Sequence, residues 1–65
     1  MRNIKKRLTC VNRGPSQEQQ KQNEIAIMKI ATRYTEKMIN KGWKIYSFST
    51  GDSFLHYEAI VRMYK

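Results

Sequence analysis

The 65-residue sequence predicts an α+β fold, in which one long amphipathic helix packs on a three-stranded, mainly antiparallel sheet in the order strand, helix, strand, strand. Apolar residues recur at helical spacing in the middle of the chain and at every second position in the segments on either side. A Gly-Pro break and a Lys-Gly-Trp step separate these segments. A chain this short has too little core to divide, so residues 1–65 are expected to form a single domain.

Residues 3–12 are predicted to form the first strand, because apolar and polar side chains alternate along them. One side is apolar and holds Ile4, Leu8 and Cys10, with Lys6 as an exception. The other side is mainly polar and holds Lys5, Arg7, Thr9 and Val11. A disordered basic arm over residues 1–13 is the alternative. Gly14-Pro15 ends the segment, because proline cannot donate a hydrogen bond to a strand ladder.

Residues 17–41 are predicted to form the helix. Ser16 is a suitable N-cap, and Gln19 follows three residues later, as a capping box requires. In the second half of the segment, apolar residues cover one broad arc of the helix and charged residues cover the opposite arc. Gly42 suits the left-handed position that commonly follows a helix, so the helix is expected to end at Lys41.

Residues 43–50 and 54–64 are predicted to be the two strands of a hairpin, with its turn at residues 51–53 (Gly-Asp-Ser). One side of the last strand is apolar throughout: Leu55, Tyr57, Ala59, Val61 and Met63. We expect this side to face the helix.

The length of the turn decides which side of the first hairpin strand faces inward. A three-residue turn places Trp43 and Ile45 beside Val61 and Ala59, under the helix. A two-residue turn would instead direct inward the aromatic residues at the alternate positions, Tyr46 and Phe48, because a shift of one residue reverses every side chain. The first register is favoured because it places the most apolar sides of the two hairpin strands on the same face of the sheet.

The junction of helix, Gly42-Trp43 and strand resembles that of a group of small bacterial and phage domains of unknown function. The matching residues are MINKGWKIYSF (38–48) and HYEAIVRMYK (56–65), with a looser match over residues 2–12. In that group the Gly-Trp step supports the fold. The resemblance therefore implies a βαββ fold and a bacterial or phage origin, and it carries no function. The strong positive charge of this chain departs from the group and leaves the partner open.

The sequence shows no catalytic or metal-binding pattern. His56 is the single histidine and Cys10 the single cysteine, and the alternation places them on opposite faces of the sheet. A zinc site needs about four ligands, which one Cys, one His and five scattered acids do not supply. The glycines are too far apart to form a phosphate-binding loop. We therefore expect a protein that is not an enzyme, with no metal, cofactor or small-molecule substrate.

The distribution of apolar residues also bears on location. The longest apolar run, residues 25–28, is too short for a transmembrane helix or the core of a signal peptide. A single cysteine cannot form an intramolecular disulfide, which is typical of a reducing compartment. A cytoplasmic location is expected.

The positive charge and the uncovered face of the predicted sheet point to binding. With 13 Lys and Arg against 5 Asp and Glu, the chain carries +8 and attracts polyanions. The face away from the helix interleaves basic and aromatic residues. Such a surface suits single-stranded DNA or RNA, because bases stack on the rings while cations contact the phosphates. The candidate binding residues are Lys5, Arg7, Lys44, Tyr46, Phe48, Phe54, His56 and Arg62.

A second class of function uses the same face. Exposed aromatic and arginine side chains are also typical of protein hot spots. The alternative is therefore a phage- or mobile-element-type inhibitor that modulates a host protein, or a homodimer formed through this face. A basic surface that only aids solubility is a third interpretation. A membrane partner is not expected, because the basic residues of the helix do not border an exposed apolar face.

Overall fold

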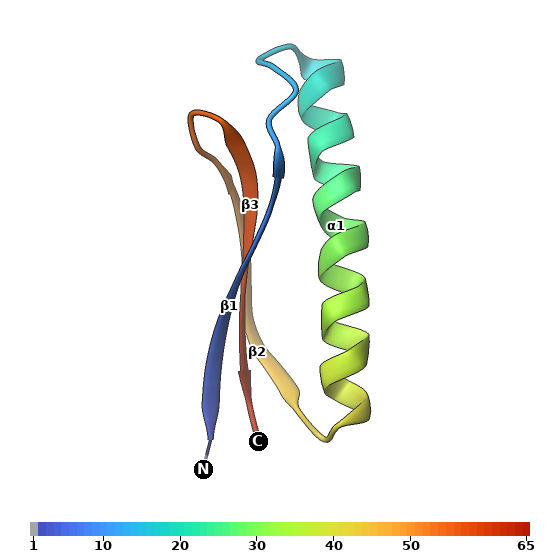
Figure 1. Ribbon diagram of the computed structural model, residues 1–65, viewed down its shortest axis with the longest axis vertical. Helices are drawn as coiled ribbons and strands as arrows, with labels where there is room; N and C mark the ends of the chain where they lie inside the picture. The colour runs from blue at the N-terminus through green and yellow to red at the C-terminus, as the bar shows by residue number, and fades with distance from the viewer. Residues whose placement is uncertain (1) are drawn as a thin grey trace.

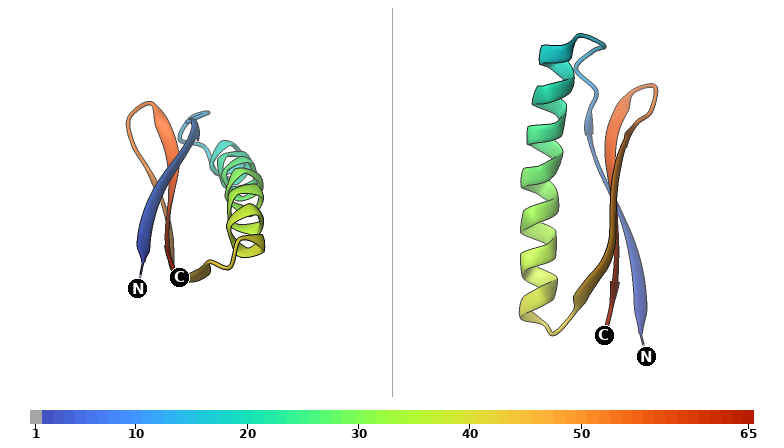
Figure 2. Two further views of the ribbon diagram at one scale, coloured as in Figure 1. Left: turned by 60° about the horizontal axis from the view of Figure 1, so that its bottom comes forward. Right: turned by 180° about the vertical axis from the view of Figure 1, so that it is seen from behind.

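The computed structural model describes residues 2–65 and contains four elements: β1 (Asn3–Val11), α1 (Gln17–Asn40), β2 (Lys44–Asp52) and β3 (His56–Tyr64). The strands form one antiparallel sheet in the order β1-β3-β2. The helix lies along one face of this twisted sheet, and no other element of residues 2–65 covers the opposite face (Figures 1 and 2). The predicted α+β fold and its β-α-β-β order are confirmed.

The start and end of α1 follow from local sequence. Ser16 caps the helix, since its Oγ accepts a hydrogen bond from Gln19 N at 3.2 Å and Ser16 N donates to Gln19 Oε1 at 3.3 Å. The helix ends at Asn40, one residue before the predicted end. Gly42 has a φ of +95°, and its N–H donates to Ile39 O at 2.9 Å. This left-handed residue turns the chain from the helix into β2.

Replacing Gly42 by alanine is expected to lower the free energy of unfolding by about 1 kcal/mol, because a Cβ disfavours a positive φ. The new Cβ would lie 3.6 Å from Lys65 Cε, an ordinary contact, so the cost is conformational. Gly51→Ala is the matched control. Gly51 has open space around its Cα, and the change should be neutral or slightly stabilising. Urea unfolding of both variants checks this, and equal stability of the two would contradict it.

The core lies between α1 and the central strand. Ile27 and Ala31 are buried on the helix. Four alternate residues of β3 are buried opposite them: Tyr57, Ala59, Val61 and Met63. Leu8 and Cys10 of β1 pack against this cluster and are partly buried. The apolar side predicted for the last strand is therefore confirmed for these four residues, whereas Leu55 is exposed in the turn before β3.

The predicted hairpin register is wrong. Strand β2 extends to Asp52, and the turn comprises residues 53–55 instead of 51–53, with Ser53 N donating to His56 O at 2.7 Å. Ile45 consequently pairs with Met63 rather than Ala59. Trp43 precedes β2 and is half-buried, with Lys65 Nζ 5.7 Å from the centroid of its ring. Gly51 and Asp52, predicted to start the turn, instead continue strand β2 and pair with Glu58 and Tyr57 of β3.

A β-bulge at Tyr46 changes the alternation of β2. Ile45 pairs with Met63 and Ser47 with Arg62, which leaves Tyr46 as an extra residue. Phe48 then lies opposite the buried Val61, on the helix-facing side of the sheet. The ring of Tyr46 lies on the other side, with its centroid 6.1 Å from that of Tyr64. A regular alternation would have kept the two β2 aromatics on one side.

A buried amide network joins the β1–α1 loop to the helix and to the hairpin turn. Asn23 of α1 is fully buried, and its Oδ1 accepts from Arg13 N at 3.0 Å. Its Nδ2 donates to Asn12 Oδ1 at 3.0 Å, which also accepts from Gly14 N at 3.1 Å. Asn12 Nδ2 donates to Ser53 O at 3.3 Å. Asn23 thereby fixes the entry of the helix relative to the sheet.

Across residues 2–65, no helix combines the length and apolar character needed to cross a membrane.

Candidate functional site

The outer face of the sheet, opposite α1, is the surface to which the sequence assigned binding. Strand pairing places three rows of side chains on it, one from each strand. These residues are Asn3, Lys5, Arg7, Thr9 and Val11 of β1, Lys44, Tyr46, Ser47, Ser49 and Gly51 of β2, and His56, Glu58, Ile60, Arg62 and Tyr64 of β3.

Six of the eight predicted binding residues lie on the outer face: Lys5, Arg7, Lys44, Tyr46, His56 and Arg62. Phe48 does not, because the bulge turns it to the helix-facing side. Phe54 lies in the hairpin turn, where it is 93% exposed and belongs to neither face. The predicted aromatic face is therefore corrected at these two positions.

Basic and tyrosine residues gather at one end of the outer face. This is the end of the sheet at which both chain termini lie (Figure 1). One row across the sheet runs Asn3, Tyr64, Lys44, and the next runs Lys5, Arg62, Ser47. The rings of Tyr46 and Tyr64 form a tilted aromatic pair, with an angle of 53° between the ring planes. We refer to this group as the basic–tyrosine cluster: Lys5, Lys44, Tyr46, Arg62 and Tyr64. It holds three cations and no acid.

The other end of the outer face carries little net charge. Arg7 Nε donates to Glu58 Oε2 in an ion pair across β1 and β3. Arg7 is exposed and Glu58 is half-buried, and Glu58 offsets the charge of Arg7. The neighbouring residues of this end are Thr9, Val11, Ser49, Gly51 and His56. Positive charge on the outer face is consequently concentrated in the basic–tyrosine cluster.

Tyr64 is the residue that the sequence-based site omitted. The alternation of the last strand already placed it on the outer face, but only the strand pairing shows that it adjoins Lys44 and Tyr46. Tyr64 is half-buried, whereas Tyr46 is 55% exposed. The more accessible ring is therefore that of Tyr46.

The residues able to perform nucleophilic or metal chemistry are dispersed. His56 lies on the outer face, while Cys10 lies on the helix-facing side with its Sγ 3.9 Å from Asn23 O. Residues 2–65 bring no three His, Cys, Asp or Glu side chains into a group that could hold a metal ion. The surface chemistry available at the outer face is charge, hydrogen bonding and aromatic stacking.

Comparisons of the chain with protein-family models, with curated proteins and with solved structures found no match, so the resemblance noted over residues 38–48 and 56–65 stays a prediction.

Proposed function

We propose that the protein is a small non-catalytic module that binds single-stranded DNA or RNA through the basic–tyrosine cluster. The observation that carries this proposal is the pair of tyrosine rings, 6.1 Å apart, among three cations on an uncovered sheet face. Bases stack on such rings in any sequence, while Lys and Arg contact the phosphates.

The geometry favours a single strand over a duplex. Neighbouring strands lie about 4.8 Å apart, so the row Lys5, Arg62, Ser47 spans about 10 Å. A three-stranded face with helix α1 behind it is broader than the helix or two-stranded ribbon that the major groove admits. Unstacked bases, in contrast, can reach the accessible ring of Tyr46 directly.

A protein partner at the same face has weaker support. Among the large apolar side chains that are exposed in residues 2–65, only Val11 and Tyr46 lie on the outer face. They sit at opposite ends of it, and the half-buried Ile60 between them is flanked on β3 by the charged Glu58 and Arg62. Hot-spot residues cluster near the centre of a protein interface, whereas the tyrosines here lie at one end of the outer face. Binding of a host protein through this face is thus the second candidate, and capture with and without nuclease treatment separates the two.

Binding to a short single-stranded oligonucleotide is expected to weaken as salt rises. If Lys5, Lys44 and Arg62 each contact one phosphate, the logarithm of the association constant should fall with the logarithm of salt at a slope of about −2, since each contact contributes about −0.7. Fluorescence anisotropy with a labelled oligonucleotide measures this slope. No complex at about 50 mM salt would overturn the proposal.

Two arginine variants locate the contacts. Arg62→Gln removes a cation of the cluster and should reduce the size of the slope by about 0.7. Arg33→Gln removes the same charge from an exposed position of α1 and should leave the slope unchanged. Equal effects of the two variants would show that net charge, rather than the cluster, governs binding.

A further inference from the structure

Strand β2 has an unpaired edge. It pairs with β3 on one side, and no strand of residues 2–65 lies on its other side. Every residue of β2 except Gly51 is exposed. An edge strand presents a row of free N–H and C=O groups that can pair with another extended chain.

The two edges of the sheet differ in charge. The β1 edge carries the consecutive cations Lys5, Lys6 and Arg7. Lys6 lies on the helix-facing side, with its Nζ 6.0 Å from the ring centroid of Tyr34. Charges on the edge, and an inward-facing charge above all, prevent further strand pairing. In β2 the residues from Ile45 to Gly51 are all uncharged, and only the bulge at Tyr46 interrupts the ladder, so residues 47–52 form a regular edge.

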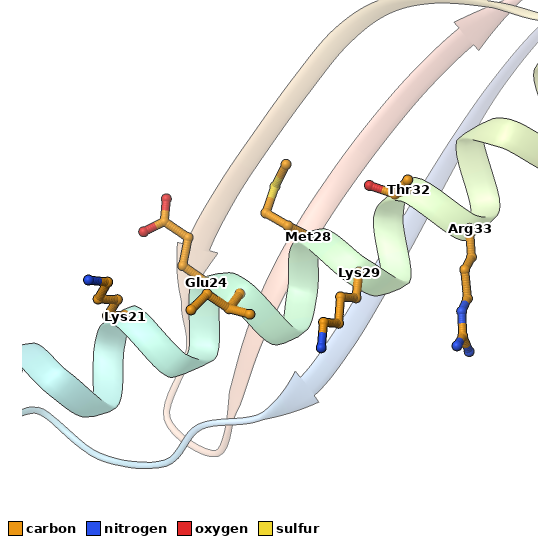
Figure 3. Close-up of a pocket in the computed structure, with 7 residues that line it drawn as sticks. Lys21, Glu24, Met28, Lys29, Thr32 and Arg33 are labelled. Carbon is orange, nitrogen blue, oxygen red and sulfur yellow. The ribbon is translucent and has the colours of Figure 1, made fainter.

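The uncharged edge is flanked by exposed apolar side chains. On the helix-facing side, Ile45 is 43% and Phe48 40% exposed, because α1 packs mainly against β1 and β3. One flank of the helix lies toward β1, because Ile30 on that flank lines a surface depression together with Arg13, which follows β1 in the chain. Met28 lies on the opposite flank from Ile30, on the side of β2, and it is exposed (Figure 3). Exposed apolar side chains of β2, and Met28 of the helix, therefore lie on the same flank of the molecule as the free edge.

We propose that a second copy of this chain occupies this edge, with the two β2 strands antiparallel about a two-fold axis. The occupant must supply an uncharged extended edge with apolar side chains above it, and β2 itself supplies both. A two-fold axis makes each contact twice and closes the assembly. It joins the two sheets into one of six strands, with both helices on the same face and Phe48 of each copy close to the axis.

The charge of the chain does not prevent this pairing. Lys44, at the start of β2, is the only cation of that strand, so repulsion between two chains of +8 comes mainly from residues outside the contact. Such repulsion is screened beyond about 8 Å at physiological ionic strength. The dimer is therefore expected to strengthen with added salt. Nucleic-acid binding should weaken with salt, so the two proposals succeed or fail separately.

Sedimentation equilibrium of nuclease-treated protein tests the dimer. The wild type is expected to dimerise with a micromolar dissociation constant that falls between about 0.15 M and 0.5 M salt. Phe48→Lys places an inward-facing charge on the β2 edge, as Lys6 does on the β1 edge. This variant should raise the dissociation constant at least about tenfold. Phe54→Lys, the same substitution in the exposed hairpin turn, should leave the dissociation constant unchanged. Circular dichroism verifies the fold of each variant.

Thr50→Lys is the second edge variant if Phe48→Lys unfolds, because Thr50 is exposed on the same side of β2. A wild-type protein that is monomeric at about 100 µM in high salt would overturn the proposal. A dimer that both edge variants leave intact, or an open series of higher oligomers, would overturn it as well.

Discussion

Replacing Asn23 by leucine is expected to lower the free energy of unfolding by about 2–4 kcal/mol. Leucine has a similar volume, but it removes the acceptor of Arg13 N–H and the donor to Asn12 Oδ1. Arg13 N–H then has no acceptor, which costs about 1–3 kcal/mol, and Asn12 Oδ1 keeps only its bond from Gly14 N, so one further hydrogen bond of about 0.5–1.5 kcal/mol is lost. A single-core domain of this size is typically stable by only about 3–5 kcal/mol, so much of the variant should unfold without denaturant. Urea unfolding followed by circular dichroism gives the difference.

Asn40→Leu is the matched control for that variant. It makes the same substitution at an exposed position at the end of α1, and its effect should stay within about 0.5 kcal/mol. If Asn23→Leu were as stable as Asn40→Leu, the amide network would not hold the β1–α1 loop to the helix.

Tyr46→Ala is expected to weaken binding of a single-stranded oligonucleotide at least about fivefold. Tyr46 is the more exposed ring of the basic–tyrosine cluster, and loss of one base–aromatic stack costs about 1–3 kcal/mol. An oligonucleotide of about six nucleotides keeps the measurement to one cluster. Because the side chain is more than half exposed, the melting temperature should change little, which separates lost binding from lost folding.

The sequence predicts those parts of the fold that depend on neighbouring residues. Ser16 and Gln19 define the start of α1 by themselves, and Gly42 defines its end to within one residue. The apolar side of β3 is predictable because β3 is the central strand, which keeps a regular alternation under the helix. The buried role of Asn23 is not predictable from its neighbours. It lies in a polar stretch of the helix, and its hydrogen-bond partners Arg13 and Asn12 are ten and eleven residues away in the sequence.

The parts that depend on strand pairing are not predictable in this way. The bulge at Tyr46 exists only relative to β3, so alternation alone assigns Tyr46 and Phe48 to one side. The ion pair of Arg7 with Glu58 likewise requires the register between β1 and β3. The sequence therefore predicts a basic outer face, whereas the concentration of its charge at one end emerges only from the pairing.

The most direct test of the proposed site compares Tyr46→Ala with Phe48→Ala on the same short oligonucleotide. Both side chains are exposed aromatics of β2, two residues apart, and the bulge directs them to opposite sides of the sheet. We expect Tyr46→Ala to lose at least about fivefold in affinity and Phe48→Ala to stay within about twofold of the wild type. Equal losses, or a larger loss for Phe48→Ala, would contradict binding through the basic–tyrosine cluster.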